Sequence, residues 1–595
     1  MRVTVSVAMT TSIIFLVLCV SLQYFCITTL ASQATCAPPP AIECKSNACD
    51  VFNYQGVWDD RGICKAQNSA WPTSEAELVQ AVANAVKNKQ RIKVVSKLSH
   101  SEPKLVCVGS EGLIISTQNY ASVIEVNKTA MTIRVQAGAL MSDVLEAAAK
   151  EGLALNAMIY WSGVSAAGVI STGAHDSGLV GKGSGVYEYV VAMRLVVPAS
   201  PSQGYAKVIS LTEADEELNA ARLSLGTLGA ISELTFALQP MYKRSISTVV
   251  KDDTDLEYEA ESFLRAHEFA DINWIPSHGK AVYIPIDRHP VNVPGDGLNS
   301  IIGSASSVVD IERKAADYEA IQDRADVEAI CSVLINETLD LAINGSGFLN
   351  DGKRFTGYPV IGFNHHMQTS GGCQAGRYSV ACTPTSILDK NETVCSWDRR
   401  IYATLYFGVE LRVPVSRLPQ VIKDVKRIRD LNPQKLCDMS GIFMRSIKKS
   451  DAYLGPKEDV VTLDMMNYRS RAVGTPKWNE DVYEEIEQMI IEKHGGVLHW
   501  GKSGGYLFQG LAKRATNLEK FMEVKKKFDS SGLFSNEWTD GLFGIEGGSL
   551  EIFRDGCALD KVCKCREDSH CAPQKGYFCK PGKVWKKARV CTKLN

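Results

Sequence analysis

Two histidines in segments of small or short polar residues are the clearest chemical signal in this chain. His100 and Ser101 follow an apolar stretch, Ile92 to Val95, that has the pattern of a short buried strand. A second histidine, His175, lies further along in a run dense in glycine, alanine and serine, Gly163 to Gly178. Small residues let the backbone approach a large planar ligand and offer N–H groups to its phosphates. Considered singly, each histidine could equally be an ordinary loop residue without a role in ligand binding.

The glycine-rich run is long for a structural turn. Its candidate ligand-binding members are Gly163, Gly168, Ser171, Thr172, Gly173 and His175. A tight turn is the alternative interpretation, and the length of the run and the histidine within it disfavour that alternative.

Two shorter segments extend the pattern. Gln136-Ala137-Gly138-Ala139 lies between a predicted strand, Met131 to Val135, and a predicted helix, Met141 to Lys150. Leu225 to Ser232 contains Gly229 and Ile231. Each segment alone is explained by an ordinary glycine turn. All four segments in this order between residues 57 and 240 predict a cofactor-binding domain.

The C-terminal half contributes charged groups. Glu410 and Arg412 lie two residues apart on a predicted strand, so both side chains face the same side of a sheet. The motif His499-Trp500-Gly501-Lys502 adds an imidazole and a second fixed cation. The alternatives are a surface ion pair for Glu410 and Arg412, and a buried tryptophan between solvated polar residues for the motif. Adjacent histidines at 365 and 366 have no carboxylate spacing around them, so we expect no metal site.

The elements around these residues predict an α+β protein of two domains with a tail. Strands and helices alternate from residue 57 to 240, but no strand is followed by the Gly-x-Gly-x-x-Gly turn of a Rossmann unit. A second domain of strands and helices is expected over residues 241–545. It includes strands at 402–413 and 460–468 and helices at 418–431, 479–493 and 518–528, whereas 301–341 reads as helical and charged.

The two ends of the chain indicate secretion. Residues 12–30 are apolar or small without charge, which predicts a signal peptide over residues 1–31; an uncleaved membrane anchor is the alternative. Of 18 cysteines, Cys19 and Cys26 lie in this segment, and the even remainder suits disulfide pairing. Six of them fall in a cysteine-rich tail, residues 550–595, where disulfides are favoured over zinc. Sequons occur at Asn127, Asn336, Asn344 and Asn391.

Composition excludes some classes of partner. The chain of 595 residues is 45% hydrophobic and 22% charged, which is ordinary for globular domains. Its net charge of −2 argues against nucleic-acid binding. The tail is locally basic around Lys583 to Arg589, which is either a solvated face or a docking surface for acidic cell-wall polymer.

The four N-terminal segments resemble the FAD-binding PCMH-type domain of the vanillyl-alcohol-oxidase superfamily. The motif at 499–502 and the Glu-x-Arg pair resemble its aldonolactone oxidase branch, and the signal and cysteine-rich tail resemble the plant L-gulonolactone oxidase group. The resemblance implies FAD bonded covalently through His100, with the other segments and His499 around it. It also implies that Glu410 orients substrate hydroxyls, that Arg412 stabilises negative charge on the reduced flavin, and that Lys502 lies near the reacting carbon. Ser96-Lys97-Leu98-Ser99 departs from the glycine-rich family loop, and Ser171 replaces a family glycine.

The implied reaction is oxidation of L-gulono-1,4-lactone by dioxygen to L-ascorbate and hydrogen peroxide, in the apoplast or cell wall. After signal cleavage no membrane insertion is expected. His100 and the signal argue against mitochondrial galactonolactone dehydrogenase, which lacks the linking histidine. The alternatives are a secreted FAD oxidase of another sugar, an alditol or an oligosaccharide, and an inactive relative that binds the cell wall.

Overall fold

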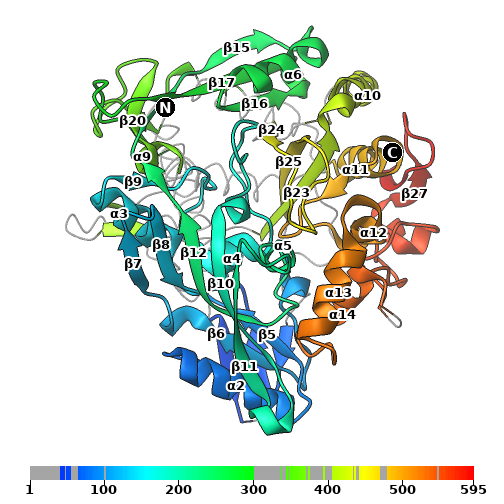
Figure 1. Ribbon diagram of the computed structural model, residues 1–595. Coiled ribbons are helices and arrows are strands. Elements are labelled where there is room, and N and C mark those ends of the chain that lie inside the picture. The colour runs from blue at the N-terminus through cyan, green and yellow to red at the C-terminus, as the bar shows by residue number, and fades with distance from the viewer. Residues whose placement is uncertain are drawn as a thin grey trace, which may run out of the picture.

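The computed structural model (Figure 1) describes most of the chain, including nearly all of the first predicted domain and of the tail. The described residues are 40–46, 48–54, 64–98, 102–300, 336, 339, 343–345, 347–369, 373–375, 393–395, 405–432, 435–436, 441–469, 479–545 and 548–594. The predictions for the signal segment, for His100 and Ser101, and for most of 301–341 lie outside these residues. Within the described part, no helix is long and apolar enough to cross a membrane.

The first domain is built on two sheets. Strands β4 (Asn68–Ala70), β6 (Leu113–Ser116) and β5 (Ile92–Val95) form a parallel sheet in the order β4-β6-β5. A second sheet is antiparallel, in the order β11-β10-β12-β8-β7, with the bounds Ala206–Thr212, Val190–Pro198, Ala230–Ala237, Thr132–Gln136 and Val123–Asn127. Helix α2 (Glu75–Lys87) begins at Ser74, whose hydroxyl accepts a hydrogen bond from the backbone N–H of Glu77. The buried side of α2 packs with residues of both sheets, so one apolar cluster joins them.

The second domain contains an antiparallel sheet of nine strands, which we call the cap sheet. Its order is β20-β14-β17-β16-β24-β25-β23-β26, with β15 also pairing with β17. The bounds are β20 Val360–Phe363, β14 Lys243–Ile246, β17 Lys280–His289, β16 Phe269–Ile275, β24 Ile442–Ile447, β25 Val460–Arg469, β23 Leu405–Pro414, β26 Val497–Leu498 and β15 Val249–Asp252. Helices α6 (Leu256–Ala266), α10 (Leu418–Leu431) and α11 (Glu480–His494) lie beside it on the side away from the first domain (Figure 1).

The two faces of the cap sheet differ in chemistry. On β23, Val409, Leu411 and Val413 are fully buried and belong to the core cluster that includes α10 and α11. The alternate residues Glu410 and Arg412 are also buried, but on the opposite face. A sheet covered on one side by helices usually exposes its other face to water. Here the first domain covers that polar face instead. The direct contact between His175 of the first domain and Glu410 of the sheet shows this.

The structure is α+β, as predicted, and several elements coincide with their expected ranges. Helices α3 (Met141–Lys150), α10 and α13 (Leu518–Phe528) begin and end at the predicted residues. The strand predicted from residue 402 is described from Leu405, and the helix predicted from Asn479 begins at Glu480. These elements were recognisable because each has one apolar stripe or a continuous buried run.

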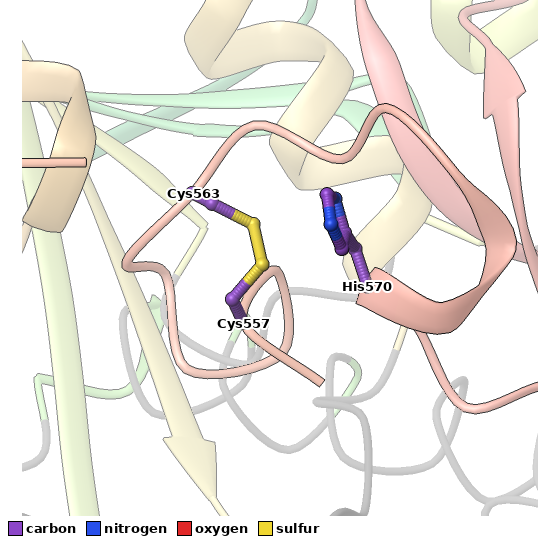
Figure 2. A group of neighbouring side chains, drawn as sticks. All are labelled: Cys557, Cys563 and His570. Atoms are coloured by element: carbon purple, nitrogen blue, oxygen red, sulfur yellow. A yellow bond between two sulfur atoms is a disulfide. The ribbon is translucent and has the colours of Figure 1, made fainter. Parts of the chain in front are cut away.

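The cysteine-rich tail is held by disulfides. Cys557 pairs with Cys563, Cys565 with Cys579, and Cys571 with Cys591, so all six tail cysteines are used and none is left as a thiolate for zinc. Figure 2 shows the Cys557–Cys563 bond with the ring of His570 beside it. Strands β27 (Tyr577–Pro581) and β28 (Arg589–Lys593) pair with each other, and each carries one cysteine of the remaining two disulfides. Disulfides also join Cys44 with Cys49 and Cys64 with Cys107.

The tail packs against helix α11 through buried carboxylates. Lys561 is only 1% exposed; its Nζ bonds Glu487 and lies 3.3 Å from Glu484 Oε1. Burial alone would lower the pKa of Lys561, but these carboxylates raise it above the ordinary value, so the ammonium stays charged. The Glu485 carboxylate accepts the backbone N–H groups of Lys583, Val584 and Trp585 at 2.7, 2.6 and 2.7 Å. Part of the basic stretch therefore faces the protein.

Replacing Lys561 with methionine should destabilise the tail and α11. The substitution keeps most of the side-chain volume but leaves Glu484 and Glu487 buried without their cation, and breaking such a pair costs about 3–5 kcal/mol. Urea unfolding under oxidising conditions measures the loss. The matched control is Lys564→Met: Lys564 pairs with Glu492 at 2.6 Å near the surface, so it should cost less than about 1 kcal/mol. Equal losses of unfolding free energy in the two variants would contradict a stabilising role of the buried Lys561 ion pairs.

Candidate active site

Three of the four predicted cofactor segments lie against one another. The backbone N–H of Ala166 donates to Ala139 O at 2.8 Å, and that of Ala137 donates to Ser232 O at 2.9 Å. The N–H of Leu225 donates to Ser171 O at 3.0 Å. The segments around Gly138, Gly173 and Gly229 thus form one continuous backbone surface, although they are far apart in the sequence.

Gly138 and Gly173 are required where they stand. A Cβ at Gly138 would lie 2.0 Å from Thr117 O, so any side chain would separate the two backbones. Gly173 has a φ of +78°, in the left-handed region that glycine adopts without strain.

The remaining predicted residues differ in accessibility. Gly168 is exposed and Ser171 and Thr172 are half-buried around the short helix α4 (Ala166–Ser171), whereas Gly163 is buried. Ile231 belongs to the hydrophobic core and pairs with Leu195 in the sheet, so only its backbone can contact a ligand.

The chain leading to His100 enters the same neighbourhood. Thr117 Oγ1 donates to Val95 O at 3.1 Å, and Ser116 Oγ donates to Ser96 O at 3.1 Å. Since Thr117 O also lies against Gly138, the end of β5 joins the other three segments. Where the side chains of His100 and Ser101 lie is outside the described residues, so their role stays a prediction.

A buried acid links the two domains. Glu410 Oε1 lies 2.6 Å from His175 Nε2, and the other ring nitrogen of His175 lies 2.7 Å from Asp176 O. A carbonyl oxygen only accepts, so Nδ1 carries a proton. Burial would raise the pKa of Glu410, but the surrounding positive groups, His175 and Arg445 among them, hold it well below the usual range. The ionised Glu410 carboxylate therefore lies against Nε2 of the His175 ring.

The ring of His499 is neutral. Its Nε2 faces Gly173 O at 3.1 Å and its Nδ1 accepts the backbone N–H of Gly501 at 3.1 Å. This pattern fits the neutral ring with the proton on Nε2. Burial agrees, because it lowers the pKa of His499 to about 3. His499 therefore positions the Gly173 backbone and contributes no charge.

Arg412 is a buried cation whose hydrogen-bonding capacity is only partly used. Its side chain is 5% exposed, Nη2 donates to Leu498 O at 3.2 Å, and the guanidinium lies 5.4 Å from the ring centre of Trp500. Its Nε has no partner, and no carboxylate among the described residues forms an ion pair with it. Burial lowers the pKa of Arg412, yet arginine stays protonated in proteins. A buried guanidinium with a free N–H suits an anionic or carbonyl ligand.

Two groups that the sequence did not assign complete the site. Arg445 Nη2 lies 3.2 Å from Glu410 Oε2 and 3.4 Å from Asp464 Oδ2, and Lys502 Nζ lies 3.0 Å from Asp464 Oδ2. Lys502 is also 3.8 Å from Glu410 Oε2. Asp464 belongs to none of the sequence motifs described above. Arg445 had one usable signal, an arginine in the otherwise apolar strand Ile442–Ile447.

The buried site carries an excess of positive charge. At the Glu410 end of the polar face, the three cations Arg412, Arg445 and Lys502 lie around two carboxylates, Glu410 and Asp464. Such a site stabilises negative charge on a bound group. It fits the flavin end of FAD, and the continuous backbone surface around Gly138, Gly173 and Gly229 fits the rest of the cofactor.

Comparison with known families matches three parts of the chain. Residues 66–200 match the family described as "FAD binding domain" and residues 389–542 match "D-arabinono-1,4-lactone oxidase". Residues 554–593 match "L-gulonolactone oxidase 2-like, C-terminal domain".

Related proteins and structures agree. L-gulonolactone oxidase 5 and L-gulonolactone oxidase 2 of Arabidopsis thaliana are each 40% identical to this chain over 583 residues, covering 96% of it and 97% and 96% of their own lengths. L-gulonolactone oxidase of Bos taurus is 23% identical over 499 residues, covering 83% of this chain and 100% of its own. A solvent-stable cholesterol oxidase shares the fold, with a TM-score of 0.62 at 15% identity, over 85% of this chain and 99% of its own.

The full-length similarity and the site geometry point the same way. The relatives cover the first domain, the cap sheet and the tail together, and the structure brings a buried arginine without an ion-pair partner among the described residues and a glycine-lined backbone surface into one molecule. The chain is an FAD-dependent oxidoreductase and belongs to the plant L-gulonolactone oxidase family, within the aldonolactone oxidases.

Proposed function

We propose that this protein oxidises L-gulono-1,4-lactone at its C2 hydroxyl carbon, with dioxygen as the electron acceptor. The products are hydrogen peroxide and a 2-keto lactone, which rearranges to L-ascorbate. The observation that carries this proposal is the cluster of Glu410, Arg412 and Lys502 on the polar face of the cap sheet. FAD, when bound, supplies the hydride acceptor and the route for electrons to dioxygen.

Glu410 and Lys502 would position the reacting hydroxyl. The low pKa of Glu410 makes its carboxylate a good hydrogen-bond acceptor but a weak base. Lys502 is half-buried and holds its ammonium between Glu410 and Asp464, so it would hold the substrate oxygen by donating a hydrogen bond. Glu410 Oε2 and Lys502 Nζ lie 3.8 Å apart, so both can contact the same substrate oxygen.

Arg412 would stabilise the negative charge that builds up on the cofactor side of the site. Its guanidinium is fixed by Leu498 O and by Trp500, so little reorganisation is needed as charge develops. Another sugar, an alditol or an oligosaccharide remains the alternative substrate, because these three groups recognise hydroxyl groups rather than one particular lactone.

We also propose that the protein is secreted and glycosylated. The predicted signal segment, residues 1–31, and five disulfides among the described residues support an oxidising compartment. Sequon residues Asn336 and Asn344 are exposed and Asn127 is half-buried beside a surface turn. Lys586 and Lys587 are exposed on the tail, which leaves them free for the proposed contact with acidic cell-wall polymer.

The experiment that tests the proposed function is an anaerobic absorption spectrum of the secreted protein. Addition of L-gulono-1,4-lactone should bleach the flavin band, because two electrons reach the cofactor and cannot leave without dioxygen. A yellow protein that bleaches with alditols or oligosaccharides but not with the lactone would favour the alternative substrates. A colourless protein would favour the inactive cell-wall relative.

Arg412→Ala should slow anaerobic flavin reduction by about 100-fold or more, since one preorganised charge donor of this kind contributes about 10²–10³ in rate. Stopped-flow spectroscopy at saturating lactone measures the rate. The matched control is Arg427→Ala, because Arg427 is 70% exposed on α10 and pairs only with Asp424 within its own helix. A reduction rate within twofold of the wild type in the Arg412 variant would remove this residue from the site.

His100→Ala should release the flavin. If the imidazole forms the covalent link, wild-type protein precipitated with acid keeps its yellow colour, whereas the variant loses its FAD to the supernatant. His267→Ala is the control, because His267 precedes β16 and pairs with Asp287 on β17, away from the predicted cofactor segments. Flavin that stays in the pellet of the His100 variant would show that another residue forms the link.

A further inference from the structure

The polar groups of the cap sheet continue beyond Glu410. In the strand register, Glu410 on β23 lies opposite Asp464 on β25, and Arg445 on β24 lies opposite Asp271 on β16. Asp464 pairs with Phe443, two residues from Arg445, so all four ionisable residues face the same side. Four adjacent strands at about 4.8 Å each give a row about 14 Å wide between the outer Cα positions. Only the Glu410 end of this row is used by the reaction proposed above.

Asp271 is fully buried at the other end of the row. One of its oxygens, Oδ2, accepts a hydrogen bond from the Tyr160 hydroxyl of the first domain, whose ring packs near Phe443 at 6.0 Å. Its second oxygen, Oδ1, has no hydrogen-bond partner. The adjacent Ser177 hydroxyl, which donates to Ala270 O, also lies near the Asp271 carboxylate. A buried carboxylate oxygen without a donor is rare in folded proteins.

Other buried polar atoms near Asp271 also lack hydrogen-bond partners. Three further buried polar atoms on the same face lack partners: Arg445 Nε, Asp464 Oδ1 and Thr462 Oγ1. Both donors and acceptors are therefore left open along the row. Hydroxyl groups match this pattern, because each can donate one hydrogen bond and accept others. A ligand with several hydroxyl groups would satisfy these atoms together, whereas an apolar ligand would leave them all unpaired.

A purely structural role explains Asp271 less well. Arg445 directs its hydrogen bonds to Glu410, Asp464 and His175 O, and it acts on Asp271 through its charge rather than through a hydrogen bond. Burial raises the pKa of Asp271 to about 6, although the Tyr160 hydroxyl and the charge of Arg445 act to lower it. A residue kept for stability would have its cation in direct contact.

We infer that Asp271, positioned by Tyr160, binds a hydroxyl group on the side chain of the substrate, at the end remote from the oxidised carbon. Arg445 separates this second binding position from the reacting end at Glu410 and Lys502. The substrate class, a lactone carrying a polyhydroxylated side chain, rests on the proposed function. The inference adds that this side chain, and not only the ring, is recognised.

The test compares two lactones in anaerobic stopped-flow reduction. L-Gulono-1,4-lactone carries side-chain hydroxyls; L-erythrono-1,4-lactone has the same two ring hydroxyls without the side chain. Asp271→Asn should raise the apparent Kd of the first about tenfold, leave its limiting reduction rate within twofold, and leave the Kd of the second unchanged. Tyr160→Phe should raise the first Kd by a smaller factor. Asp252→Asn is the control, since Asp252 is 73% exposed and pairs with Lys280 on the same sheet.

The outcomes separate the inference from the proposed function. If the wild-type flavin is not bleached by the lactone, the proposed substrate is wrong, and the same comparison is made by flavin difference spectra with xylitol and glycerol. A larger effect of Asp271→Asn on xylitol than on glycerol would then still support the inference. Equal changes for the long and short ligand, a loss of rate without a change in Kd, or no ligand effect at all would overturn it. If Asp271→Asn does not fold, Tyr160→Phe carries the same test.

Discussion

The buried contact between Glu410 and His175 is the constraint on which the rest of the site depends. Glu410 comes from the cap sheet and His175 from the glycine-rich run of the first domain, so this buried hydrogen bond joins the two domains at the site itself. It keeps Glu410 ionised without making it a strong base. Since burying an acid is costly unless it is paired, the surrounding cations Arg445 and Lys502 are needed for the same reason. The charge that suits the site to a flavin thus follows from how its domains are joined.

On the other side of the sheet, the tail also pairs buried carboxylates with a cation from another part of the chain. Helix α11 packs its apolar side against β23 and presents carboxylates to Lys561 and to the backbone of Lys583–Trp585. Three disulfides make the tail rigid enough to hold a buried lysine in place. The strand that carries Glu410 and Arg412 is therefore supported from behind by a helix whose own polar side is neutralised by the tail.

Sequence alone predicted the parts of this protein that depend on local pattern. Helices α3, α10 and α13 were found because their apolar residues recur at helical spacing, and Glu410 and Arg412 were placed on one face because strands alternate. Arg445, Asp271 and Tyr160 were missed. Their importance comes from pairing between strands that are far apart in the sequence, β16 with β24 and β24 with β25, and no local pattern encodes that register. Gly138 and Gly173 were predicted as ligand-binding residues, but the contact between Gly138 and Thr117 O became visible only in three dimensions.

The central claim is that this buried, positively charged site oxidises an aldonolactone with dioxygen. The most direct measurement is the stoichiometry of the purified protein acting on L-gulono-1,4-lactone, with oxygen uptake, hydrogen peroxide and ascorbate followed in the same sample. The account predicts one dioxygen consumed and one hydrogen peroxide and one ascorbate formed for each lactone oxidised. Ascorbate formed only with an added electron acceptor, without oxygen uptake or peroxide, would contradict it.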